Sequence, residues 1–154
     1  MPTRSLAAAI AVIAVAALAA CGGGASSSST SPTTRTSEAL VSFEREGGIA
    51  YSRIELVVDA GGDAHVVIST APTKRNARSV TVDDAELARL RRLIDATPLA
   101  GLPQTPPTGC ADCYRYRLAY GGARYTTDEA SIPARLRPVV AELETIAGVG
   151  AGGK

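Results

Sequence analysis

The chain lacks most of the side chains that catalysis uses. It contains a single histidine, His65, no tryptophan and only three cysteines. It has no nucleophile elbow, paired-histidine zinc motif, phosphate-binding loop or dinucleotide fingerprint. A zinc site needs about four ligands, so one built here would have to borrow carboxylates. Asp128 and Glu129 could form an acid–base pair, but adjacent acids before a helix are more often solvated first-turn charges. We therefore expect no enzyme, no cofactor and no metal site.

An excess of charge is also missing. The 16 basic and 15 acidic residues nearly cancel, and lysine occurs only at Lys74 and Lys154. A strongly basic surface is what attracts nucleic acid without sequence preference. We therefore expect no nucleic-acid partner.

The N-terminal residues have the layout of a secretory signal. Arg4 is followed by a run from Leu6 to Ala20 that no polar residue interrupts. A positive start, a short apolar run and small residues before the cleavage site are typical of such signals. The run is shorter than the roughly 20 residues that a transmembrane helix needs. We predict a signal peptide at residues 1–20; a short anchor that stays attached is the alternative.

The segment Leu18-Ala19-Ala20-Cys21 resembles the lipobox of bacterial lipoproteins. The resemblance implies that Cys21 is linked to diacylglycerol and becomes the N-terminus after cleavage. Two acyl chains anchor a protein stably, whereas one does not. We expect the protein at the extracytoplasmic face of the cell membrane, with the lipid bilayer as a partner. Gly22 follows in place of a retention aspartate, which favours the outer membrane in a two-membrane cell. A chance cysteine after a signal peptide is the alternative.

Composition divides the rest of the chain. Residues 22–37 are rich in glycine, serine and threonine, and such sequences bury too little apolar surface to fold. We predict a lipidated cysteine and disordered tether at 21–37, one folded domain at 38–148, and a disordered tail at 149–154.

Cys110 and Cys113 remain once Cys21 is assigned to lipid. Cysteine pairs outside the cytosol are usually oxidised, so we expect a structural disulfide. The pair runs into a strand and does not begin a helix, which argues against a redox centre. A redox pair, metal ligands and free thiols are the alternatives.

Hydrophobic periodicity predicts an α+β domain. Alternating residues indicate strands near 39–44, 53–58, 65–69, 114–120 and 124–127. Residues 71–78 are interpreted as a basic loop, with 79–82 as a further short strand. We expect an antiparallel sheet of about five strands with two amphipathic helices packed on one face.

Two segments have helical spacing. Asp83 and Glu86 are placed to cap a helix that ends before Pro98. The second helix lies within 132–146, where Pro138 either kinks it or begins its regular part. The predicted core consists of Val41, Phe43, Ile54, Leu56, Val58, Val66, Ile68, Leu87, Leu90, Ile94, Tyr116, Leu118, Val140, Leu143 and Ile146.

Tyrosine and arginine gather in residues 114–125. Both types are favoured in protein-recognition patches. The candidate partner-binding residues are Tyr114, Arg115, Arg117 and Arg124. We favour the interpretation that the tyrosines cover the helices while the arginines lie on the open face of the sheet.

Short motifs in residues 43–50, 109–114 and the last helix resemble the emfourin-type domain. This small bacterial α+β family has a named member that inhibits thermolysin-like metallopeptidases. The resemblance covers about Val41 to Ala147 and implies that the protein partner is a secreted metallopeptidase. We expect the domain to be monomeric. The lipobox and the cysteine pair depart from the family, and no inhibitory residue is carried over. A structural or accessory envelope lipoprotein without inhibitory activity is the alternative, followed by a redox or metal-dependent enzyme.

Overall fold

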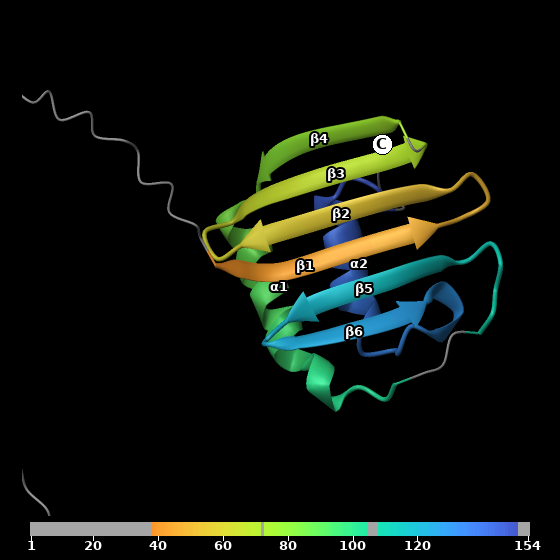
Figure 1. Cartoon of the computed structure of the whole chain (residues 1–154). Helices are drawn as coiled ribbons and strands as arrows, with labels where there is room; N and C mark the ends of the chain where they lie inside the picture. The colour runs from red at the N-terminus through yellow and green to blue at the C-terminus, as the bar shows by residue number, and fades with distance from the viewer. Residues whose placement is uncertain (1–37, 72, 105–107, 151–154) are drawn as a thin grey trace, which may run out of the picture. The chain divides into compact units, whose positions relative to one another are not determined.

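The computed structural model describes residues 38–71, 73–104 and 108–150 (Figure 1). The predicted signal peptide, Cys21 and the tether lie outside the described residues. The strands are β1 (Ala39–Gly47), β2 (Ser52–Asp59), β3 (Asp63–Ala71), β4 (Lys74–Thr81), β5 (Tyr114–Tyr120) and β6 (Ala123–Asp128). The helices are α1 (Asp84–Ala96) and α2 (Arg137–Ile146), with 3-10 turns η1 (Leu99–Gly101) and η2 (Glu129–Ser131).

The six strands form one antiparallel sheet in the order β4-β3-β2-β1-β5-β6. β1 to β4 follow one another as hairpins, and α1 then returns the chain so that β5 pairs with β1. Phe43 on β1 lies opposite both Leu56 on β2 and Leu118 on β5. The α+β class and the antiparallel sheet with two helices agree with the sequence prediction.

The strand count is six rather than about five because of β4. Residues 74–78, interpreted as a basic loop, belong to this strand and pair with β3. Nearly every residue of β4 is exposed, so the strand has no alternation of apolar and polar residues to reveal it. The pairing with β3 forms it instead.

The turns follow from local chemistry. Between β2 and β3, a carboxylate oxygen of Asp59 accepts hydrogen bonds from the amides of Gly61 (2.8 Å) and Asp63 (2.9 Å). Between β5 and β6, Gly121 and Gly122 both have positive φ, as a type I′ hairpin requires.

The helix ends also follow the sequence. The Asp83 side chain accepts a hydrogen bond from the amide of Glu86 at the start of α1, as predicted. Pro138 begins the regular part of α2. At its end Gly148 has φ +68°, and the amides of Gly148 and Val149 donate to the carbonyls of Thr145 and Glu144, a Schellman motif.

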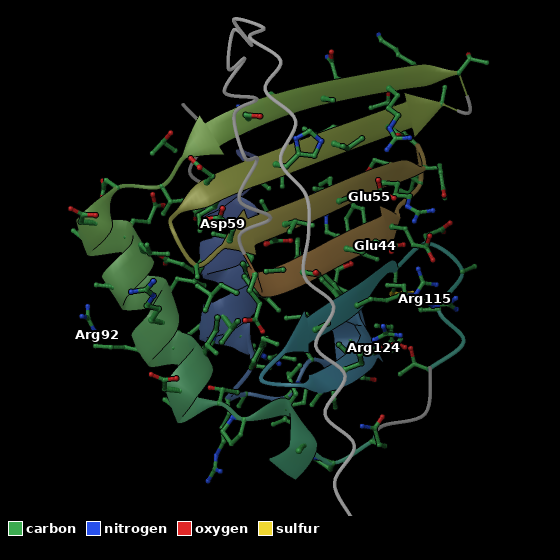
Figure 2. All side chains as sticks on the ribbon, turned by 60° about the vertical axis from the view of Figure 1, so that its left-hand side comes forward. Glu44, Glu55, Asp59, Arg92, Arg115 and Arg124 are labelled. Atoms are coloured by element: carbon green, nitrogen blue, oxygen red, sulfur yellow. A yellow bond between two sulfur atoms is a disulfide. The ribbon has the colours of Figure 1, made fainter. Side chains whose placement is uncertain are left out.

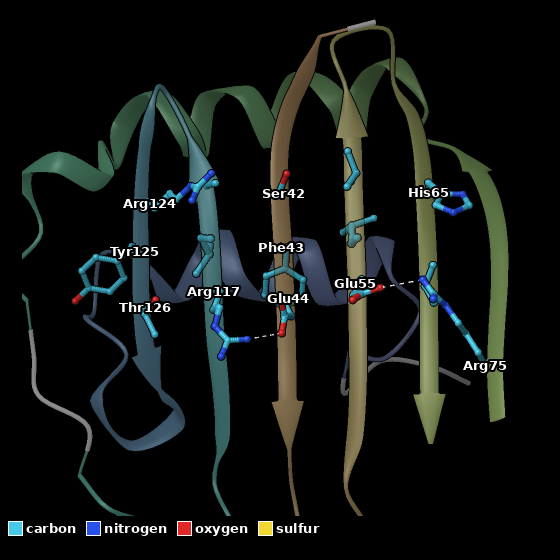
Figure 3. Close-up of a pocket in the computed structure, with 15 residues that line it drawn as sticks. Ser42, Phe43, Glu44, Glu55, His65, Arg75, Arg117, Arg124, Tyr125 and Thr126 are labelled. Carbon is cyan, nitrogen blue, oxygen red and sulfur yellow. Dashed lines mark hydrogen bonds and ion pairs between the residues drawn. The ribbon is translucent and has the colours of Figure 1, made fainter. Parts of the chain in front are cut away.

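The helices lie behind the sheet in Figures 1 and 3, and their buried residues share one cluster with alternate residues of the strands. Every predicted core residue is buried except Ile68, which is partly exposed at the far end of β3. The cluster also contains Val82, Leu99, Tyr120, Tyr125, Leu136, Val139 and Ala147.

Candidate functional site

The open face of the sheet, opposite the helices, carries a network of ion pairs. Glu44 on β1 lies directly opposite Glu55 on β2. Three arginines surround this pair of like charges: Arg53, Arg75 and Arg117. Arg117 contacts Glu44 (2.5 Å) and Glu46 (2.9 Å), and Arg53 contacts Glu55 (2.8 Å). Figure 2 shows Glu44 and Glu55 projecting from β1 and β2, with Arg115 and Arg124 on β5 and β6. The network occupies Arg117, so this arginine is not free for a partner.

A shallow hollow of about 520 Å³ lies beside the network on this face (Figure 3). Its middle is a cross-strand row of the small residues Ser42, Val57 and Ala119. His65 on β3 and Arg124 on β6 continue the row at its two ends. Arg124 is exposed and has no hydrogen bond or ion pair with another described residue. Of the candidate residues on this face, Arg124 and Arg115 are the ones left available.

Tyr114 lies on the opposite side of the sheet from the arginines of its hairpin. It is partly buried against the core, and the guanidinium carbon of Arg45 lies 4.4 Å from its ring centroid. Arg45 in turn contacts Glu144 of α2 at 2.7 Å. The structure therefore separates Tyr114 from Arg117 and Arg124, and the four candidate residues do not form one patch.

The other hairpin tyrosines are structural donors. Burial and the neighbouring Glu144 carboxylate raise the pKa of Tyr116 well above its usual range. Burial raises the pKa of Tyr120 to about 12, and its hydroxyl donates to the carbonyl of Thr97 at 2.7 Å. These phenols stay protonated and hold the sheet against the helix layer and the segment after α1.

Cys110 and Cys113 form a disulfide in the structure, with 5.4 Å between their Cα atoms. The disulfide loop lies next to the turn between β1 and β2, because Gly47 pairs with Tyr114. A Cβ atom on Gly47 would come within 2.6 Å of the Cys113 carbonyl oxygen, and Gly47 has φ +123°. Only glycine permits this close approach.

We call the turn Gly48–Tyr51 together with the loop Cys110–Cys113 the tip. The tip carries the most exposed large apolar side chains of the described residues: Ile49 is 92% exposed and Tyr51 51%. Tyr51 has φ +30°, which is strained for a residue with a side chain. A small hollow of about 220 Å³ between the turn and the loop is lined in part by Tyr51, Cys110 and Arg115. Exposed apolar groups beside an unpaired arginine fit a protein contact.

Neither Ile49 nor Tyr51 was predicted as a site residue from the sequence. Both follow the glycine pair Gly47 and Gly48. The signal in the sequence that could have identified them is an apolar residue in a glycine-rich turn, because turn residues seldom face a core.

Asp128 was interpreted as a solvated charge, and this is wrong. It is 8% exposed, and its carboxylate accepts from the amide (2.6 Å) and hydroxyl (2.7 Å) of Thr108 and from the amide of Ser131 (2.9 Å). The hydrogen bonds from Thr108, followed by those from Ser131, lower the pKa of Asp128 to about 2. Asp128 therefore fixes the loop before the disulfide to the end of β6.

Among the described residues, His, Cys, Asp and Glu side chains form no group of three or more that could hold a metal ion. His65 projects from the open face (Figure 3). Within the described residues, no helix has the length and apolar character needed to cross a bilayer. No protein-family model matches the chain, and a search of the curated proteins also finds no match.

Proposed function

We propose that this chain is a lipid-anchored extracytoplasmic lipoprotein whose domain binds another protein through the tip. The anchor is the diacylglyceryl group on Cys21, and the domain stands off the membrane on the segment 22–37. In this proposal both amphipathic helices pack on one face of the sheet, so that the tip and the opposite face are presented outward.

The lipobox-like segment Leu18–Cys21 supports the anchor. It follows a positively charged start and an uninterrupted apolar run, which is the order of parts in a lipoprotein signal. The two acyl chains attached to such a cysteine give stable membrane binding.

The exposure of Ile49 is the observation that carries the binding function. A side chain of this size at 92% exposure contributes nothing to the core, and burying an isoleucine contributes about 1.5–3 kcal/mol. Tyr51, two positions along the same turn, lines the small hollow of the tip together with Arg115. Tyrosine and arginine are enriched among residues that dominate binding energy.

The emfourin resemblance narrows the partner to a thermolysin-like metallopeptidase. The test measures inhibition of several such enzymes by the full mature chain in detergent, with Ile49→Ser and the exposed control Arg92→Ser alongside. We expect inhibition that Ile49→Ser weakens by about tenfold or more and that Arg92→Ser leaves unchanged. Full peptidase activity at stoichiometric excess of the wild-type chain would exclude the inhibitor function.

Fractionation tests the anchor separately. Wild-type protein should incorporate labelled fatty acid and sediment with membranes, whereas Cys21→Ala should do neither. Cys110→Ala serves as the control, because it removes a cysteine outside the lipobox and should stay lipidated. Acyl labelling of the Cys21→Ala variant would contradict the proposed anchor.

A structural or accessory envelope role without inhibition is the second candidate, and the lipobox favours it equally. Capture of wall or secretion components that Ile49→Ser abolishes, with no effect on peptidases, would identify this role.

A further inference from the structure

The two edges of the sheet differ in how the chain protects them. At one edge, η1 lies against β6, and the Tyr125 hydroxyl donates to the Pro103 carbonyl at 2.7 Å. At the other edge, β4 pairs with β3 only and is exposed along nearly its whole length. Figure 1 shows β4 at the border of the sheet with no ribbon of the described residues beyond it. β4 is therefore the open edge.

The backbone groups that β4 directs outward follow from the register. The amide of Val82 donates to the carbonyl of Gly62 at 2.9 Å, one position beyond the pair Asp63 and Thr81. Hydrogen-bonded and non-hydrogen-bonded pairs alternate in an antiparallel ladder. The even-numbered residues of β4 therefore bond to β3, and the amides and carbonyls of Arg75, Ala77 and Ser79 point away from the sheet. This row matches what an added strand requires.

All charged side chains of β4 are positive. The strand contains Lys74, Arg75 and Arg78 and no acidic residue. Arg75 contacts Glu55 at 3.3 Å, and Arg78 donates to the Ala147 carbonyl at 2.7 Å. Lys74 has no hydrogen bond or ion pair with another described residue. A strand added here would lie beside three positive side chains, which favours an acidic sequence.

A hollow adjoins the edge on the helix side. It measures about 370 Å³ and is lined by Ile68, Asn76, Ala77, Arg78 and Gly148. Side chains of an added strand alternate between the two faces of the sheet. The residues that point to the helix side can enter this hollow and cover the part of Ile68 that the helices leave exposed.

The chain itself supplies no suitable strand. Residues 1–37, 72, 105–107 and 151–154 contain no aspartate or glutamate. A second copy would place one basic β4 against another, and like charges opposite each other are destabilising. Basic residues on an edge suppress such self-pairing and still admit an acidic partner.

We propose that β4 accepts an extended acidic segment of a partner protein as a seventh strand. Amides and carbonyls of Arg75, Ala77 and Ser79 form the new ladder. Lys74, whose side chain is not engaged by another described residue, selects the acidic side chains, and the exposed Arg75 and Arg78 add positive charge beside it. The inference deepens the proposed function, on which it rests, by adding a second contact at a site distinct from the tip.

The experiment measures fluorescence anisotropy of a labelled ten-residue peptide that alternates glutamate with threonine. The receptor is the full mature lipoprotein in nanodiscs. We expect saturable binding that weakens by about tenfold with a glutamine–threonine peptide. Ala77→Pro removes one outward amide without removing a β3–β4 hydrogen bond, so it should weaken binding by about tenfold. The matched control Ala77→Thr keeps the amide and should bind within about twofold.

A second pair of variants guards against misfolding of Ala77→Pro. Lys74→Glu should weaken binding by about fivefold, and Lys74→Arg should leave it unchanged. Absence of binding, equal binding of the glutamine peptide, or insensitivity to both Ala77→Pro and Lys74→Glu would overturn the inference. Self-association through β4 would overturn it as well.

A variant of the tip distinguishes this inference from the proposed function. Ile49→Ser should leave peptide binding intact, because the tip lies at the β1–β2 turn. If the wild-type chain inhibits a peptidase but does not bind the acidic peptide, the inference fails and the proposed function stands. If the peptide binds at β4 while Ile49→Ser leaves all protein binding unchanged, the proposal that the tip binds a partner is wrong and the inference about β4 stands.

Discussion

Arg45 on β1 and Glu144 on α2 form an ion pair at 2.7 Å, 99 positions apart in the chain. Their side chains are 13% and 18% exposed, so neither charge is fully hydrated. The Tyr116 hydroxyl also donates to Glu144, at 3.3 Å, and the Tyr114 ring lies against the guanidinium. This polar cluster fixes the last helix against the central strands.

Glu144→Gln should therefore destabilise the domain. The change keeps the shape of the side chain but leaves the Arg45 charge without its counterion, at a cost of about 1–3 kcal/mol in the free energy of unfolding. Urea unfolding at neutral pH measures the cost. Arg92→Gln on the exposed side of α1 is the control and should stay within about 0.5 kcal/mol of wild type. Equal midpoints for Glu144→Gln and wild type would show that the pair adds no stability.

Gly47→Ala should be more disruptive than its size suggests. The new methyl group would meet the Cys113 carbonyl, and φ of +123° is unfavourable for alanine. Strain of this kind costs about 1–3 kcal/mol before the clash is counted. Gly101→Ala is the matched control, because its Cβ would meet nothing within 4 Å and its φ is ordinary. Thermal unfolding compares the two, and similar melting temperatures would contradict the close approach of β1 and the disulfide loop.

Asp128 should make the free energy of unfolding depend on pH in the acid range. Its folded pKa of about 2 lies below the ordinary value of about 3.9. A lowered folded pKa stabilises the folded state above the unfolded pKa, and this stability disappears as the pH falls from about 4 to about 2. Asp128→Asn should reduce stability at pH 7 and flatten the pH dependence across that window. Urea midpoints at several pH values test this, with Asp95→Asn as an exposed control. Parallel curves for Asp128→Asn and wild type would refute the role of Asp128.

Local chemistry made much of the fold predictable. Alternation located β1, β2, β3 and β5, and the Asp83 cap located α1, because these patterns depend on neighbours in sequence. The end of β4 was predicted as a short strand at 79–82, but residues 74–78 were missed because they are exposed and only the ladder with β3 makes them part of a strand. Asp128 was misjudged for a related reason, since its partner Thr108 lies 20 positions away.

The candidate site was less predictable than the fold. The sequence placed Tyr114, Arg115, Arg117 and Arg124 in one hairpin, and the structure agrees with the interpretation that the tyrosines face the core while the arginines lie on the open face. Arg117 on β5 pairs with Glu44 and Glu46 on β1, and only the register of these two strands brings the arginine to the two carboxylates. The tip depends on the pairing of Gly47 with Tyr114, a contact between segments that are distant in sequence.

Removal of the disulfide should affect the tip more than the core. The chain-entropy expression gives about 2 kcal/mol for so small a ring, and no buried core side chain belongs to the loop. The double variant Cys110→Ser with Cys113→Ser should therefore keep its fold while amide exchange accelerates around residues 109–114 and 48–51. Exchange in α2 and β3 should change uniformly and only by the loss of global stability. A uniform increase with no excess at the tip would show that Asp128 and Gly47 hold the loop without the disulfide.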